Sequence, residues 1–473
     1  MDHRPSSKPS VTTDLARRRV VVVGLGRAGG AAVRFLSGRG AQVVATDRRR
    51  ADDLADVLAG LPKGVTIELG EHRLATFVEA DLVVTSPGVP PIRELNEAVR
   101  HGVPVMDEAE LASRFIEGTL LGVTGTNGKS TTTVLLGKLI ETLGRPLFVG
   151  GNLGSALCDC LETEAAGPNG VVVAELSSFQ LQRTQQLHPK VALFLNLSQD
   201  HLDRHADMDE YVAAKKRIFA NQNETDFAVL NADDPLCRAM ANDLRAQVAW
   251  FSVESSVSPG GYLDGDVMRL VLPGQDEVRL DRSLLRIPGR HNVANALAAL
   301  VAAGLLGVDL REVAAVLSVF TGLPHRMEHV GSFMGLDFYN DSKATNVGSA
   351  VGSLSGLEQQ FVLIAGGRHK GGSYEALARV LANRARAVVL LGEAAPIMAE
   401  ELAGTVPLHR AETMDEAVVL ASSLAVPGEA VVLSPACSSY DMFVDYRARG
   451  QAFRDAVAAV QGRAGTDEYR RVP

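Results

Sequence analysis

The stretch GVTGTNGKST at residues 122–131 decides the fold of this chain. An apolar run that starts at residue 120 leads into it and predicts a buried parallel strand, and a helical pattern follows it. A glycine-rich turn at such a junction binds phosphate, because backbone N–H groups and the helix N-terminus face the phosphate oxygens. Lys129 would reach the outer phosphates of ATP, and the Ser130 hydroxyl could ligate Mg²⁺. Val123 stands where the usual spacing has glycine, and the glycines fall at 122, 125 and 128.

Apolar runs and helical patterns alternate on both sides of this loop, which is typical of doubly wound parallel sheets. The predicted strands lie at 20–23, 42–47, 81–88, 170–177, 190–198, 227–234, 336–342, 361–367, 387–392 and 430–436. Residues 252–287 differ, because short alternating segments broken by Gly and Pro predict a small antiparallel patch there. Helical patterns cover 291–307 and the segment after residue 440.

We therefore expect an α/β protein of three domains, which suits a chain of 473 residues at roughly 100–200 residues per domain. The predicted units are a disordered tail at 1–18, a Rossmann-like domain at 19–116, a P-loop ATPase-like domain at 117–322 and a Rossmann-like domain at 323–473. A linker is expected at 321–328, where TGLPHRME separates the second unit from the third.

Composition narrows the class of protein. The net charge is −9 without a basic stripe, so we expect no nucleic-acid partner. No run of 18 apolar residues exists, which predicts no membrane span. The four cysteines are few and unevenly spaced, which favours reduced thiols and a cytoplasmic location. We expect a monomer.

A second glycine fingerprint follows the first predicted strand. Gly24, Gly26 and Gly29 have the spacing GxGxxG, and Asp47 ends the next strand. This pattern is typical of dinucleotide binding, but the same geometry holds any diphosphate at a helix N-terminus. Because ATP has its own loop, this site could bind NAD or another nucleotide-linked molecule.

Acidic and basic residues follow the strands of the central unit. Glu175 ends one strand, and Asp200 and His201 come just after the next. Side chains at the carboxyl ends of parallel strands point into the ligand crevice. Glu175 and His201 could therefore hold Mg²⁺ with Ser130, and Lys215 would lie within reach of the metal.

Eight blocks occur in an order that strongly resembles the Mur ligases of peptidoglycan synthesis. They are GVTGTNGKSTT, AELSSFQL, LNLSQDHLDRH, YVAAKKRIF, PGRHNVANALAAL, FTGLPHRME, NDSKATN and VLSPACSSYDMF. The resemblance covers about residues 19–463, and within the family the chain looks most like the member that adds D-glutamate to UDP-N-acetylmuramoyl-L-alanine. That resemblance implies phosphorylation of the acceptor carboxylate by ATP, with two Mg²⁺ sites, and then attack by the amino acid through a tetrahedral intermediate.

The resemblance also implies roles for individual residues. Catalysis would rest on Lys129, His201 and Lys215, and metal binding on Ser130, Glu175, His201 and a carbamylated Lys215. The ATP site would comprise Gly125, Thr126, Asn127, Gly128, Lys129, Ser130, Thr131, Asn292, Arg326 and Asp341. The UDP-sugar site would comprise Gly26, Arg27, Ala28, Asp47, Gly88, Asn152, Ser177 and Gln180. The incoming amino acid would meet Lys343, Thr345, Lys370, Ser439 and Tyr440.

Other functions stay open at this point. An NAD-dependent oxidoreductase with an accessory NTPase domain would use the first fingerprint but leaves NDSKATN unexplained. A non-catalytic ATP-binding module conflicts with the joint presence of Lys129, Glu175, His201 and Lys215. A folylpolyglutamate synthetase would lack the complete amino-terminal unit. A relative that adds L-glutamate, or another Mur ligase, remains possible because motifs do not reveal stereochemistry.

Overall fold

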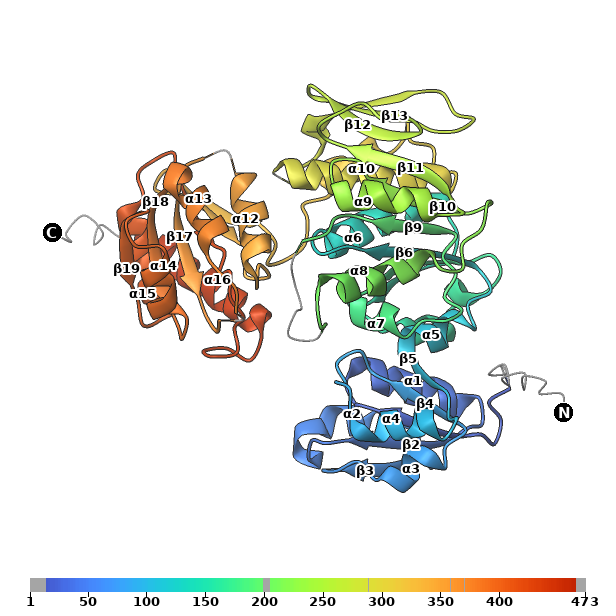
Figure 1. The fold of residues 1–473 in the computed structure, drawn as a ribbon. Coiled ribbons are helices and arrows are strands. Elements are labelled where there is room, and N and C mark those ends of the chain that lie inside the picture. Colours follow the sequence, from blue (N-terminus) through green and yellow to red (C-terminus); the bar gives the residue numbers. More distant parts are fainter. Residues whose placement is uncertain (1–13, 199–204, 288, 358, 370, 465–473) are drawn as a thin grey trace.

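The computed structural model describes residues 14–464 except 199–204, 288, 358 and 370, and it contains three sheets. Each sheet forms a separate layered unit with helices on its faces, and the units follow one another along the chain (Figure 1). The central unit lies between the other two, which contact it at different places. The predicted α/β class is confirmed. The exact domain boundaries, which no observation here tests, stay predictions, and the predicted disordered tail lies mostly outside the described residues.

The first unit is a five-stranded parallel sheet in the order β3-β2-β1-β4-β5. Its strands are short and apolar, and four of the five residues of β1 are fully buried because helices cover both faces. Its elements are β1 (Arg19–Val23), α1 (Arg27–Gly38), β2 (Gln42–Asp47), α2 (Ala55–Ala59), β3 (Thr66–Leu69), α3 (Leu74–Val78), β4 (Leu82–Thr85), α4 (Arg93–Arg100), β5 (Val105–Asp107) and α5 (Glu108–Ser113).

The third glycine of the first fingerprint lets α1 approach the sheet. A Cβ on Gly29 would overlap the carbonyl oxygen of Gly24, which is backbone and cannot move aside. We expect Gly29→Ala to lower the free energy of unfolding by about 1–3 kcal/mol, as overpacking does. Urea denaturation measures this change. Gly26→Ala is the matched control because its Cβ would meet nothing within 4 Å, and equal stability of the two variants would contradict the prediction.

The central unit has nine strands in the order β14-β13-β12-β11-β10-β9-β6-β8-β7. The Ala-rich helix α10 is buried on nearly all sides and packs against α6 and the sheet. The elements are β6 (Thr119–Thr124), α6 (Lys129–Ile140), β7 (Leu147–Gly151), β8 (Val171–Glu175), α7 (Ser178–Gln182), β9 (Val191–Phe194), α8 (Met208–Lys216), β10 (Phe227–Asn231), α9 (Pro235–Met240), β11 (Gln247–Ser252), β12 (Gly260–Asp264), β13 (Val267–Val271), β14 (Val278–Asp281), α10 (Arg290–Leu305) and α11 (Ala314–Val319).

The segment expected to form a small antiparallel patch extends the central sheet. β12, β13 and β14 pair antiparallel with one another, as predicted, but β12 also pairs in parallel with β11. Sequence analysis did not assign β11 as a strand, and without it the patch had no visible attachment. The central core therefore continues into the three antiparallel strands.

The third unit has six strands in the order β15-β16-β20-β17-β18-β19, parallel except for β15. The last helix begins at Tyr446, several residues after the predicted start. The elements are β15 (Glu328–Phe333), β16 (Leu336–Asn340), α12 (Val347–Ser355), β17 (Phe361–Gly366), α13 (Glu375–Arg384), β18 (Ala385–Leu391), α14 (Ala395–Glu401), β19 (Leu408–Arg410), α15 (Met414–Leu424), β20 (Ala430–Leu433) and α16 (Tyr446–Ala464). In the part of the chain that the structure describes, no helix is long and apolar enough to cross a membrane.

Candidate active site between three units

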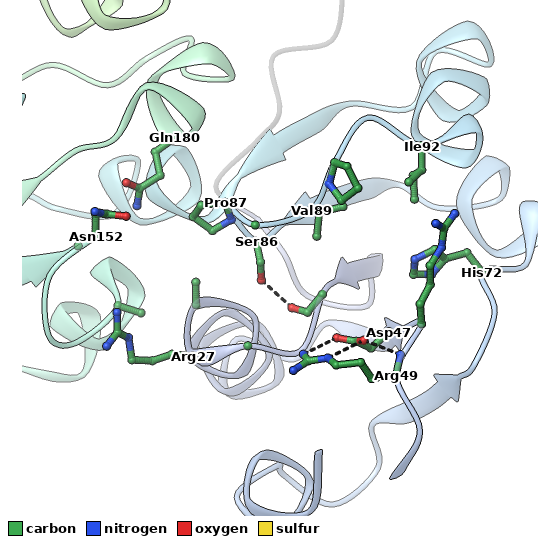
Figure 2. Close-up of a pocket in the computed structure, with 18 residues that line it drawn as sticks. Arg27, Asp47, Arg49, His72, Ser86, Pro87, Val89, Ile92, Asn152 and Gln180 are labelled. Atoms are coloured by element: carbon green, nitrogen blue, oxygen red, sulfur yellow. Dashed lines mark hydrogen bonds and ion pairs between the residues drawn. The ribbon is translucent and has the colours of Figure 1, made fainter. Parts of the chain in front are cut away.

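A cavity of about 430 Å³ lies between the first unit and the central unit (Figure 2). The first fingerprint forms one wall, and Asn152 and Gln180 of the central unit face it from the other side. Gly26 caps α1 without a side chain, which leaves the space in front of this helix open. Gly24 has a φ of +86°, and its carbonyl accepts a hydrogen bond from Ser86 Oγ at 2.6 Å. The cavity is thus built for a ligand that approaches the backbone closely.

Three arginines line this cavity, and within the described part of the chain only Arg49 forms an ion pair with a carboxylate there. Asp47 accepts hydrogen bonds from Leu25 N and from the Arg49 guanidinium, at 2.7 and 2.8 Å. Burial alone would raise the pKa of Asp47, but these donors lower it to about 2. Arg27 and Arg48 also line the cavity, and neither donates a hydrogen bond to any described residue. The cavity therefore presents two uncommitted guanidinium groups, which suits an anionic ligand.

The phosphate loop joins β6 to α6 and holds two lysines. Lys129 Nζ donates to the carbonyls of Gly125 and Thr126, at 2.9 and 2.8 Å. Lys215 Nζ comes from α8 and donates to the same Gly125 carbonyl at 2.8 Å. Lys215 is buried and lies 4.8 Å from the centre of the Tyr211 ring. Two ammonium groups thus meet at one loop, although their residues are far apart in the sequence.

A second cavity, of about 260 Å³, lies beside the phosphate loop, between the central and third units. Asn292, Arg326 and Asp341 line it, as do the apolar side chains of Phe251 and Ile287. Ser434 Oγ donates to Asp341 at 2.8 Å, while burial raises the pKa of Asp341 to about 6. An apolar pocket with a few amide and carboxyl groups at its rim fits a purine nucleoside.

Two hydrogen bonds join the third unit to the phosphate loop. Arg326 Nη2 donates to Ser130 Oγ at 2.7 Å, and Ser349 Oγ donates to Asn127 Oδ1 at 2.7 Å. These contacts bring the third unit against the loop that would hold the triphosphate.

A cleft of about 830 Å³ opens between all three units. Among the described residues, only Arg27 and Asn152 line both this cleft and the first cavity. The cleft also brings together residues predicted for catalysis and amino-acid binding, namely Lys129, Lys215, Lys343, Thr345 and Tyr440. Ser130 and Glu175, predicted for metal binding, and Arg326, predicted for ATP binding, line it as well. A long ligand seated in the first cavity could therefore reach the phosphate loop through one opening.

The donor set near Glu175 fits a hard divalent cation. Glu175 Oε1 accepts a hydrogen bond from Asn152 Nδ2 at 2.7 Å, whereas the buried Oε2 has no partner among the described residues. An unpaired buried carboxylate oxygen is costly unless a cation meets it. Ser130 Oγ lines the same cleft, and oxygen ligands with phosphate suit Mg²⁺. His201 lies outside the described residues, within which no cluster of three or more His, Cys, Asp or Glu could hold a metal.

Lys343 lies between the phosphate loop and α16. Its Nζ is 3.8 Å from the centre of the Tyr446 ring, a cation–π contact. Burial is the main cause that lowers the pKa of Lys343 to about 8; the nearby Arg326 adds to the lowering, and Glu175 opposes both. The ammonium group therefore carries its charge at neutral pH and loses it just above.

This titration gives a pH-dependent prediction. If Lys343 binds a carboxylate of the incoming amino acid, KM for that amino acid should stay level below pH 8 and rise above it, because a cation is lost as pH passes its pKa. Initial rates from pH 6.5 to 9.5 measure the profile. Lys343→Arg should remove the rise, since arginine stays charged. A flat profile in the unaltered protein would contradict the role.

The structure places the remaining predicted residues unevenly. Gly88, Ala28 and Gln180 line the first cavity, but Ser177 lines the cleft instead. Ser439 is buried and lines neither the two cavities nor the cleft. Lys370 lies outside the described residues. All these roles stay predictions.

Several lining residues escaped sequence analysis. They are His72 and Val89 in the first cavity, Asn231, Asp233, Phe251, Ile287 and Asn295 in the second, and Arg447 in the cleft. Asn295 had a visible signal, because it follows Asn292 by one turn on an otherwise apolar helix. Phe251 and Ile287 had none, since an apolar residue at a strand end or in a loop is ordinary.

Comparisons with known proteins agree with this geometry. Residues 18–107 match the family description "Mur ligase MurD-like, N-terminal domain", residues 123–303 match "Mur ligase middle domain", and residues 325–437 match "Mur ligase, glutamate ligase domain". A UDP-N-acetylmuramoylalanine–D-glutamate ligase of Geotalea daltonii is 43% identical over 95% of this chain and 99% of its own length. The protein of that name from Geobacter metallireducens is 45% identical over 94% of this chain and 98% of its own length.

Solved structures of lower identity share the fold. A pseudomurein peptide ligase type C from Methanothermus fervidus has a TM-score of 0.61 and 19% identity, and covers 94% of this chain and 100% of its own. A UDP-N-acetylmuramate–alanine ligase from Thermotoga maritima has a TM-score of 0.59 and 22% identity, with the same coverage. The three-unit α/β architecture, the matches along nearly the whole chain and the identity to curated relatives lead to one conclusion: this chain belongs to the Mur ligase family.

Proposed function

We propose that this chain joins D-glutamate to UDP-N-acetylmuramoyl-L-alanine with ATP as the phosphoryl donor, in peptidoglycan precursor synthesis. The observation that carries the proposal is the wall that two spaces share: Arg27 and Asn152 line both the cavity suited to a nucleotide-linked anion and the cleft that holds the phosphate loop. The third unit closes the cleft with Lys343 and Thr345. The names of curated relatives at 42–45% identity supply the substrates of this proposal.

The chemistry follows from the residues around the loop. A carboxylate is a poor electrophile, so transfer of the γ-phosphoryl group gives it a leaving group, and the amine then attacks to form a tetrahedral intermediate. Lys129 would leave the Gly125 and Thr126 carbonyls for the outer phosphate oxygens and offset charge as it develops there. Arg326, which donates a hydrogen bond to Ser130 in this structure, would contact the same phosphates. Closure of the third unit would keep water from the acyl phosphate.

Mg²⁺ is part of this proposal. Bound between Glu175 and Ser130, it would offset phosphate charge, and a second ion near Lys215 would need a carboxylate there, which carbamylation of the lysine would supply. The cytoplasmic location and monomeric state predicted from the sequence belong to the same proposal. Cell fractionation and light scattering check them.

The deciding experiment is phosphate release with UDP-N-acetylmuramoyl-L-alanine, ATP and Mg²⁺. D-glutamate, L-glutamate, L-alanine and a diamino acid are tested in parallel. We expect rapid release with D-glutamate alone. A preference for L-glutamate would identify the stereochemical alternative, and no release with any amino acid would overturn the ligase assignment.

A further inference from the structure

Asn152 lies between the proposed acceptor site and the proposed metal site. It directly follows β7, and it lines both the nucleotide cavity and the reaction cleft. Arg27 is the one other described residue that does so. A ligand that extends from the cavity into the cleft along this shared wall would therefore lie beside Asn152.

Asn152 donates two hydrogen bonds to Glu175, one from its backbone and one from its side chain. Asn152 N donates to the Glu175 carbonyl at 2.9 Å, and Asn152 Nδ2 donates to Glu175 Oε1 at 2.7 Å. The preceding Gly151 has a φ of +94°, and a Cβ there would lie 2.5 Å from the Glu175 carbonyl oxygen. Only glycine lets the turn approach β8 this closely.

The hydrogen bond from Asn152 leaves the negative charge of Glu175 intact. Glu175 is 3% exposed, and the amide donor satisfies one of its oxygens without neutralising the carboxylate. The full negative charge stays available to a cation at Oε2, which has no described partner. A lysine or arginine in place of Asn152 would compete with that cation.

The amide has a second, unused side. Asn152 is exposed to the cleft, and its Oδ1 accepts no hydrogen bond from any described residue. An amide N–H or hydroxyl of the acceptor substrate could donate to Oδ1 while Nδ2 remains on Glu175. Binding of the acceptor would then hold the amide, and through it the carboxylate, in one orientation.

We propose that Asn152 is a positioning residue that couples binding of the nucleotide-sugar acceptor to binding of the divalent cation at Glu175. This inference rests on the proposed function, from which the acceptor and the cation come. It adds that the two ligands raise each other's affinity, because linkage is reciprocal, and that one amide carries most of the effect.

The test measures Mn²⁺ binding by electron paramagnetic resonance in the presence of a non-hydrolysable ATP analogue, with and without saturating UDP-N-acetylmuramoyl-L-alanine. In the unaltered protein the acceptor should raise Mn²⁺ affinity about fivefold or more. In Asn152→Ala the affinity without acceptor should fall about tenfold, as for other residues that orient a metal ligand, and the increase on adding acceptor should vanish. Equal melting temperatures of the two proteins verify folding.

Arg27→Leu is the matched control, because Arg27 lines the same two cavities but does not contact Glu175. It should weaken acceptor binding, measured by calorimetry, and keep the full increase in Mn²⁺ affinity once the acceptor saturates. If Asn152→Ala keeps the increase, or Arg27→Leu loses it equally, the inference is wrong. Failure of the unaltered protein to bind the acceptor would instead defeat the proposed function.

Discussion

Lys129→Ala should lower kcat for phosphate release about a thousandfold or more. The lysine begins α6 directly after Gly128, and its ammonium lies on the Gly125 and Thr126 carbonyls of the phosphate loop. From there it can turn to phosphate oxygens that the loop backbone also contacts. A cation held beside the transferring phosphoryl group stabilises the negative charge that develops in the transition state, without the reorganisation that solvent water would require. Removal of such a cation lowers kcat by about this factor.

The measurement is a coupled phosphate assay with ATP, acceptor and D-glutamate each at saturation. Lys138→Ala is the control, since Lys138 lies on the same helix but is exposed and paired with Glu141 at 2.8 Å. That variant should keep normal activity. Near-normal turnover of Lys129→Ala would contradict the proposal that this loop binds ATP.

Lys215→Ala should be the second severe change, with kcat lowered about a hundredfold or more. Lys215 is 2% exposed and donates to the Gly125 carbonyl, so its terminal atom lies where a second cation is proposed. If the lysine is carbamylated, its added carboxylate supplies a metal ligand. A small carboxylate in solution could then occupy the space left by alanine.

Rescue by acetate or formate distinguishes this role from a structural one. We expect partial recovery of the Lys215→Ala rate with added short carboxylates, and none with chloride at equal ionic strength. Lys216→Ala is the control, because Lys216 is adjacent but lies at the surface near Asp243. Full activity of Lys215→Ala without additive would refute the role, and a low rate that no carboxylate raises would refute carbamylation.

Most of the architecture could be predicted from the sequence, because parallel strands that are buried on both faces consist of continuous apolar runs. β2, β8 and β17 lie within the predicted segments, and β1 and β6 each begin one residue before theirs. Six strands were not predicted: β3, β5, β7, β11, β15 and β19. Among them, β7 has three apolar residues before its two glycines, and β11 has a run of four between Gln247 and Ser252, of which two are only half-buried. The attachment of β12 to β11 depends on that missed strand.

The candidate site divides in the same way. Residues next to a glycine turn or at a strand end, such as Lys129 and Glu175, could be chosen because the local pattern fixes where they point. Ser439 was named through the family resemblance alone, and its burial depends on how the third unit packs. His201 and Lys370 lie outside the described residues, so their predicted roles stay open.

The sequence by itself determined the phosphate loop, the α/β class and the family, since each depends on local spacing or on the order of short blocks. Only the tertiary structure decided that Arg27 and Asn152 line both the nucleotide cavity and the cleft, and that Arg326 contacts Ser130. These are contacts between residues up to 196 positions apart. Such contacts depend on how three separately folded sheets pack, and local propensity carries no information about that packing.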